Sequence, residues 1–429
     1  MAKVRRTLDV REGGLRRDVL ASLECAMSGQ SEKAQSELGP GFLVTAAFIG
    51  PGTILTASRA GAEFGLSLLW ALLFSLAMTF VLQEMALRIG LVKRLALTTI
   101  LSDAVSQPLF KWGLLVLVAL AIVVGNSAYE GGNLTGAAAG AALLFGGDLR
   151  VWLIFLASVC ALLLLWGRYH RLERILVVLV ALMAVMFGLS AIVMVLNSEG
   201  AGIRLLPSAP SNRSEWIVLA LIGTTVVPYN LFLHASLVQR KWAKGVPLDQ
   251  AMSAARRDLA ISLVIGGIVT IAVMVTAAYL YQGGKAPSQL SDLPAQLAPI
   301  AGPFAEMAFA LGLLAAGLSS ALTAPLAASL TLEGAFHRDS QPSRWLFRGT
   351  WAVVLLCGAG FAVTSRQPVE LILIAQVTNA LLLPLLAIIL IVLAARTGIM
   401  GQHTSRSWQS GLAVLAAVVC AYLSVQRFL

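Results

Sequence analysis

The sequence has 429 residues, of which 58% are hydrophobic and only 12% charged, and its mean hydropathy is +0.84. Soluble proteins carry about 25% charged residues, so this composition excludes a soluble globular domain and predicts an all-α membrane protein. The net charge of +10 does not call for a nucleic-acid partner, because cationic loops on one face of a membrane account for it.

The chain is expected to begin with a cytoplasmic tail over residues 1–39. This stretch mixes basic and acidic groups and lacks the apolar core and cleavage site of a signal peptide. From residue 40 onward, apolar runs recur near the roughly 20 residues needed to cross a bilayer. They predict eleven transmembrane helices, at about 41–64, 66–88, 113–144, 151–167, 174–196, 216–239, 259–281, 303–332, 345–363, 368–394 and 408–426.

The Lys and Arg residues between these helices indicate the orientation, because cationic loops stay in the cytoplasm. With the N-terminus inside, 24 of the 31 Lys and Arg residues fall in inside segments, and six fall outside. We therefore predict an integral protein of a bacterial inner membrane, with a cytoplasmic N-terminus and an external C-terminus. The expected partners are the lipid bilayer and a small inorganic ion, and the expected state is a monomer.

The first predicted helix is interrupted at its middle. The stretch "AAFIGPGTILTASRAG", residues 46–61, carries Gly50-Pro51-Gly52 at the depth where the backbone has no water to bond. Each unpaired N–H or C=O group there costs several kcal/mol unless it lines a cavity or is buried in protein. A proline kink is the simpler explanation of this feature taken alone.

A second interruption favours a binding site over a kink. The sixth helix, "IGTTVVPYNLFLHASLVQ" at residues 222–239, has Pro228 followed by a polar Tyr-Asn pair. Two broken helices five spans apart are typical of a 5+5 inverted repeat, here about 40–197 and about 215–396, with the substrate between the two breaks. The transporter core then covers residues 40–396, and residues 397–429 add a loop and helix 11.

The same stretches resemble the Nramp (natural resistance-associated macrophage protein) family of proton-coupled divalent-metal transporters. "GPGFLVTAAFIGPGTILTASRAGAEFG" is similar to the family's first helix and "VVPYNLFLHASLVQ" to its sixth. "LAAGLSSALTAPLAASLTLEGAF" is similar to the eighth, and "AQVTNALLLP" to the tenth. The resemblance runs from about residue 40 to 395, and it implies a LeuT-type fold that works by alternating access.

The motifs depart from the family at the two breaks. Where the family has Asp-Pro-Gly-Asn, residues 50–53 read Gly-Pro-Gly-Thr, and the family's Ala, Met and His of the sixth helix are replaced as well. The carboxylate, thioether and imidazole are thus missing, and the sequence looks closer to the Nramp-related magnesium transporters than to the manganese and iron carriers. The candidate substrate-binding residues are Gly50, Gly52, Thr53, Thr224, Val227, Tyr229 and Asn230.

What remains at the breaks suits an anion. Half-helices that begin after a break present free N–H groups and the positive end of a dipole, and the Thr and Tyr hydroxyls can donate. Arg59 would add positive potential along the access path, unless Glu63 at i+4 pairs with it. We therefore expect a secondary transporter for a small anion such as bicarbonate, with proton linkage as an additional hypothesis.

Two other functions stay open. Divalent metal transport, of Mg²⁺ or Mn²⁺, is implied by the family, and a sensor that kept the fold without transport is the third hypothesis. The sequence shows no P-loop with its Lys, no Cys-x-x-Cys and no His-Glu-x-x-His. An enzyme, a cofactor and a resident metal are therefore not expected.

Ionisable residues inside the spans are functional candidates by default. Glu130 matches an acidic residue of the family's proton path, His234 matches a family histidine, and Arg348 matches a basic residue linked to that path. The resemblance therefore implies a proton route from Glu130 to His234 or Arg348. The competing interpretation is a buried Glu130–Arg348 pair and a hydrogen-bonded histidine in the core.

Overall fold

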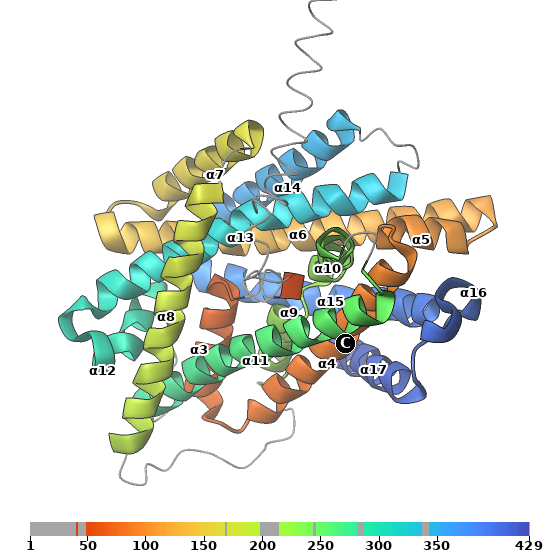
Figure 1. Ribbon diagram of the computed structural model, residues 1–429. Coiled ribbons are helices and arrows are strands. Elements are labelled where there is room, and N and C mark those ends of the chain that lie inside the picture. The colour runs from red at the N-terminus through yellow and green to blue at the C-terminus, as the bar shows by residue number, and fades with distance from the viewer. Residues whose placement is uncertain are drawn as a thin grey trace, which may run out of the picture.

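The computed structural model describes residues 40–41, 49–167, 170–197, 214–242, 246–281, 287–336 and 343–428, and most of them are helical (Figure 1). The predicted cytoplasmic tail, residues 1–39, lies outside the described residues. So does the segment 42–48, which would form most of the inner half of the first span. Within the described residues, ten helical stretches are long and apolar enough to cross a membrane. Helix α3 is the outer half of the predicted first span, which is therefore only partly described.

The longer helices follow the predicted spans, with shifted ends. They are α3 (Pro51–Phe64), α4 (Leu69–Lys93), α6 (Pro108–Phe145), α7 (Leu149–Trp166), α8 (His170–Asn197), α9 (Glu215–Thr225), α10 (Pro228–Lys241), α11 (Leu248–Leu280), α13 (Ala305–Phe336), α14 (Arg344–Thr364), α15 (Pro368–Ala395) and α17 (Ser407–Phe428).

Short connecting helices were not predicted from the sequence, because each has at most eight residues and no spanning apolar run. They are α5 (Leu97–Ala104), η1 (Leu290–Leu297), α12 (Ala298–Ala301), η2 (Gly302–Phe304), α16 (Thr397–Met400) and η3 (Gly401–His403).

Proline and glycine set many of the helix ends. Pro51 and Pro228 occupy the first turn of α3 and α10, where a missing N–H is tolerated and the fixed φ favours a helix. Gly65 ends α3 with a φ of 61°, and Gly167 ends α7 with a φ of 69°, a backbone conformation that only glycine adopts without strain. These local signals explain why the sequence located the elements well.

The helices pack as one body with two main groups. Helix α6 runs along α13 and α14, and Figure 1 shows α13 and α6 lying side by side across the molecule. Helix α3 packs along α11, and α10 packs against α4. Helix α15 contacts both groups, since it packs against α6 of the first group and against α3 and α4 of the second, as well as against α9. The interrupted helices therefore lie where the two groups meet.

The outward faces of the bundle are apolar. Large side chains such as Ile154 on α7, Val178 on α8, Ile261 on α11 and Leu356 on α14 are more than half exposed. A soluble protein would not present so many exposed Leu, Ile and Val side chains, whereas hydrocarbon solvates them without cost. This surface agrees with the membrane location predicted from composition.

Candidate functional site

The first break places a backbone turn and a hydroxyl at the start of α3. Gly50 precedes the helix in an extended conformation, and its carbonyl accepts the N–H groups of Thr53 and Ile54 at 3.1 and 3.2 Å. Pro51 has no N–H, so the N–H of Gly52 is the first backbone donor of α3 that has no partner within the helix. Both glycines are buried, and the Thr53 side chain is 2% exposed.

The second break separates α9 from α10 at residues 226–227. Pro228 explains it, because proline lacks the N–H that a continuous helix would donate to the carbonyl of Thr224. Val227 caps α10, and its carbonyl accepts the Asn230 N–H at 3.0 Å. Its side chain is fully buried and apolar, so Val227 contributes backbone to the site and no polar side chain.

The two breaks meet at a pair of hydroxyls. Thr53 Oγ1 of α3 and Thr224 Oγ1 of α9 lie 2.7 Å apart, within hydrogen-bond distance, although 171 positions separate them in sequence. The Thr224 side chain has no exposed surface. Among the candidate substrate-binding residues, these two are therefore brought into direct contact.

Helix α15 closes one side of this junction. A Cβ on Gly52 would overlap the Gln376 side-chain amide, so the α3 break and the middle of α15 are in contact. Gln376 Nε2 donates to the carbonyl of Ile372 at 3.3 Å, whereas the buried Oε1 has no hydrogen-bond partner among the described residues. Asn379, one turn on, donates to the Gly223 carbonyl at 3.3 Å. One free acceptor oxygen thus faces the junction.

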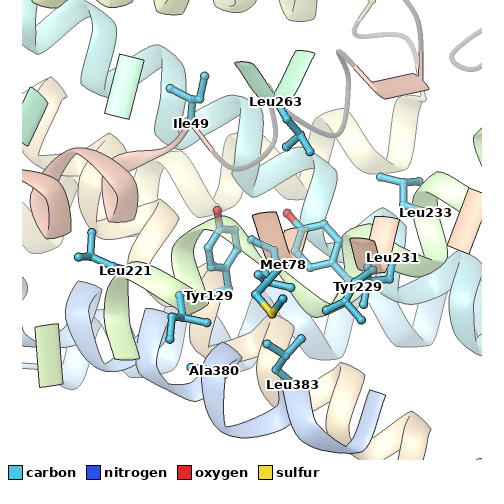
Figure 2. Close-up of a cluster of buried hydrophobic side chains, with 14 of the residues drawn as sticks. Ile49, Met78, Tyr129, Leu221, Tyr229, Leu231, Leu233, Leu263, Ala380 and Leu383 are labelled. Carbon is cyan, nitrogen blue, oxygen red and sulfur yellow. The ribbon is translucent and has the colours of Figure 1, made fainter. Parts of the chain in front are cut away.

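Helices α6 and α13 close another side. A Cβ on Gly50 would lie 3.3 Å from Ser320 Oγ, 3.7 Å from the Tyr129 hydroxyl and 3.9 Å from Asn133 Oδ1. Tyr129 and Tyr229 pack edge to face with their ring centroids 5.9 Å apart, and Figure 2 shows the two rings side by side. The Tyr229 hydroxyl has no hydrogen-bond partner among the described residues. The junction is therefore lined by neutral oxygen and nitrogen atoms.

The space beside the junction is narrow. A narrow space between α6, α10 and α15, bordered by Asn126, Pro228, Tyr229 and Asn379, has no room for a water molecule. A bound ion would need the surrounding helices to separate.

The C-terminal half of α3 carries an ion-pair cluster. Arg59 Nε donates to Glu63 Oε1 at 2.7 Å, as the i+4 spacing predicted, and Arg59 Nη1 lies 3.3 Å from Glu370 Oε1 on α15. Two carboxylates thus face one guanidinium, so Arg59 does not give this access path a positive charge. The cluster also ties α3 to α15 beside the path.

The structure does not join the residues of the expected proton route. Glu130 is fully buried, but it faces α14, because a Cβ on Gly358 would lie 2.6 Å from the Glu130 Cβ. Arg348 is exposed, and no ion pair to Glu130 is present within the described residues, so the alternative of a buried Glu130–Arg348 pair is wrong for this structure. His234 Nδ1 lies 2.8 Å from Gln83 Oε1 of α4, as a hydrogen-bonded core histidine would.

Most of the atoms that could contact an ion at the junction are neutral oxygens. The described residues contain no group of three or more His, Cys, Asp and Glu side chains that could hold a metal. The end of α9, however, directs its last carbonyls and the negative end of its dipole toward the junction. In broken-helix transporters, such carbonyls and half-helix C-terminal ends coordinate cations. The site therefore combines donors that suit an anion with acceptors that suit a cation.

Several lining residues were not among the sequence candidates. They are Tyr129, Asn133, Ser320, Gln376 and Asn379. The last three lie in the stretches similar to the family's eighth and tenth helices, so the resemblance could have pointed to them. For Tyr129 and Asn133, only polarity within an apolar span could have drawn attention to them.

Comparison with known sequences gives one family. The sequence profile described as natural resistance-associated macrophage protein-like matches residues 41–429. The chain is 29% identical over 425 residues to the divalent metal cation transporter MntH of Brucella suis biovar 1, covering 95% of this chain and 91% of that protein. It is also 29% identical over 402 residues to MntH of a Nostoc species, covering 90% and 89%.

Solved structures with the same fold come from several transporters. A mutant of the manganese transporter of Eremococcus coleocola superposes with a TM-score of 0.70 at 22% identity, covering 90% of this chain and 85% of that one. MhsT in complex with L-phenylalanine gives 0.58 at 16% identity, covering 90% and 98%. The LeuT-type fold that the resemblance implied is confirmed by these likenesses.

Proposed function

The chain belongs to the Nramp family of membrane transporters, and from that membership we propose that it carries a divalent metal cation across the membrane by alternating access. The relatives are named divalent metal cation transporters, which favours this function over the anion that the sequence alone suggested. Transport by a secondary mechanism in a bacterial inner membrane, with the N-terminus inside, is part of the same proposal.

The carbonyl end of α9 is the observation that supports a cation at this site. Pro228 deprives the Thr224 carbonyl of its helical partner, and the Thr224 hydroxyl lies 2.7 Å from that of Thr53. Gln376 adds a buried acceptor oxygen that the described residues leave unbonded. We propose that these oxygens, from Thr53, Thr224 and Gln376, contact the ion once the helices separate around it.

The ligand chemistry favours a hard ion. Carbonyl, hydroxyl and water oxygens suit Mg²⁺ and Mn²⁺, whereas softer ions prefer imidazole or thiolate, and the His234 Nδ1 is already engaged with Gln83. Because no carboxylate lies among the residues described at the junction, the ion would keep part of its hydration shell. Weak binding follows, with a high KM for metal uptake.

Uptake into liposomes tests this proposal. The purified protein should drive accumulation of Mn²⁺ or Mg²⁺, and Thr53→Val and Thr224→Val should each reduce it at least severalfold. Thr225→Val is the matched control, because the Thr225 hydroxyl bonds to carbonyls of its own helix at 3.0 and 3.1 Å. Anion-driven change of internal pH without any metal uptake would overturn the metal assignment.

Proton linkage is a separate part of the proposal and rests on Glu130. Glu130 is a fully buried carboxyl inside a membrane-spanning helix, and ionisable side chains at such positions are typical of proton paths. Metal uptake should then acidify the vesicle interior, and Glu130→Gln should abolish the acidification. Acidification that persists in the variant would exclude Glu130 as the carrier of the proton.

A further inference from the structure

A second cavity lies away from the junction, where α4 ends and α11 and α17 begin. Its volume is about 410 Å³, and it is lined by side chains of these three helices and of the segment that precedes α17. The distribution of Lys and Arg assigns this end of the bundle to the cytoplasmic face. A volume of this size is in the range of small-ligand sites, about 300–1,000 Å³.

Positive charge exceeds negative charge around this cavity. Arg88, Arg256 and Arg406 line it together with two carboxylates, Glu84 and Asp249. Arg256 donates to Glu84 Oε1 from Nε at 2.9 Å and from Nη2 at 2.7 Å, and Arg88 Nη2 lies 3.2 Å from Glu84 Oε2. One buried carboxylate is thus shared by two guanidinium groups.

Arg88 also has an unsatisfied donor. Its side chain is only 3% exposed, and its Nη atoms donate to the His403 carbonyl at 2.9 Å and to Ser405 Oγ at 2.8 Å. Its Nε has no hydrogen-bond partner among the described residues. Arg256 and Arg406 add like-charge repulsion to Arg88. Because Arg88 Nε is inaccessible, an anion in the cavity would not bond to it, but it would offset the repulsion among the three guanidinium groups.

Part of the cavity lining is apolar. Phe80, Glu84 and Arg88 follow one another at four-residue spacing, so they form one stripe along α4 that runs from an aromatic ring to a guanidinium at the membrane face. Met252 of α11 and Trp408, in the first turn of α17, complete the apolar lining. Trp408 is 52% exposed, as expected for a tryptophan at the membrane interface.

We propose that this cavity binds the phosphate headgroup of an anionic phospholipid from the cytoplasmic leaflet. Arg256 and Arg406, which are exposed, would bond the phosphate, and the acyl chain would pass along Phe80 and Trp408. Basic pockets between transmembrane helices on the cytoplasmic side are typical headgroup sites. A soluble phosphate would use the same arginines but would gain nothing from the apolar lining. This inference does not depend on the substrate proposed above.

Thermal unfolding of the full-length protein in detergent tests the site. Water-soluble dihexanoyl phosphatidylglycerol should raise the midpoint in a saturable way, and dihexanoyl phosphatidylcholine should raise it much less. Arg256→Gln and Arg406→Gln should each weaken the apparent affinity for phosphatidylglycerol roughly fivefold. Arg406 is exposed, so its variant is expected to fold even if changes near buried Glu84 are not tolerated.

Arg257→Gln is the matched control, because Arg257 is exposed, adjacent in sequence, and does not line the cavity. It removes the same charge from the same helix and should leave the affinity unchanged. Equal weakening by Arg257→Gln, or equal stabilisation by the two lipids, would overturn the proposal. Inorganic phosphate or glycerol phosphate that alone gives the full stabilisation would show that the site takes a soluble anion instead.

Discussion

Placing a carboxylate at the first break is the sharpest test of the sign of the transported ion. Gly50 stands where the resemblance to the Nramp family implies an aspartate. Its φ of −121° and ψ of −174° are extended values that any residue adopts, and a Cβ there would be 3.3 Å from Ser320 Oγ. Gly50→Asp should therefore fit with a shift of a few tenths of an ångström.

The expected gain in metal binding is the balance of two large terms. A divalent cation about 4 Å from one carboxylate gains roughly 8 kcal/mol at an effective dielectric constant near 20. Burying the carboxylate costs several kcal/mol, part of which the hydroxyls of Ser320 and Tyr129 offset by donating to it. A net gain of about 1–3 kcal/mol remains, so the KM for Mn²⁺ should fall about 5- to 150-fold.

Uptake of Mn²⁺ into liposomes, measured over a range of concentrations, provides the assay. Gly50→Asn is the control, because it has nearly the same shape and carries no charge. The aspartate variant should also unfold at a lower temperature without metal than with it, since an unpaired buried carboxylate destabilises the protein. If Gly50→Asp leaves the KM unchanged or raises it, while Gly50→Asn behaves the same, the reasoning about a cation between the two breaks is refuted. An anion transporter would lose its flux in the aspartate variant.

Three further predictions concern packing, the outer ion pairs and the orientation. Gly223→Ala should destabilise the protein by about 1–3 kcal/mol or more, because the added Cβ would overlap the Gln376 backbone carbonyl. Gly360→Ala is the control: Gly360 has open space around it, so the apparent melting temperature should stay nearly unchanged. Glu370→Gln removes the negative charge from the 3.3 Å contact with Arg59 that links α15 to α3. The rate of metal exchange should rise by up to about fivefold, and an unchanged rate would show that the ion pair does not restrain this end of α3. Alkaline phosphatase fused to the C-terminus should be active, because that end is predicted to lie outside. An inactive C-terminal fusion, together with active fusions to the loops predicted to be cytoplasmic, would reverse the predicted orientation.

Local chemistry made much of the fold predictable from sequence. Pro51 and Pro228 interrupt their helices because proline lacks an N–H, and this effect depends on nothing distant. The Arg59–Glu63 pair was expected from its spacing alone, and it forms at 2.7 Å; Glu84 and Arg88, at the same i+4 spacing, also pair, at 3.2 Å. Contacts of this kind are set within one or two turns of a helix.

Long-range contacts could not be predicted in the same way. Arg256 bonds to Glu84 from 172 positions away, so the spacing of Glu84 and Arg88 within α4 indicates only part of a three-residue cluster. The alternative of a Glu130–Arg348 pair is wrong, because Glu130 lies against Gly358 of α14 while Arg348 remains exposed. A single sequence gives the face of a helix only when its apolar residues leave one face distinct, and α6 is apolar nearly all round.

The preference of the central site for an anion or a cation could not be predicted from sequence either, because it depends on which helix ends meet there. From sequence, the half-helices that start after the breaks could be counted, and their N-terminal ends favour an anion. The fold adds the C-terminal end of α9, because Pro228 both ends that helix and removes the donor that its Thr224 carbonyl would have bonded. Thr53 and Thr224 then lie together at the point where a positive helix end and a negative helix end meet. Hydroxyls can donate or accept hydrogen bonds, so the nearest group with a full charge decides whether the site prefers a cation or an anion. A single carboxylate at residue 50 should therefore be enough to commit the site to a cation.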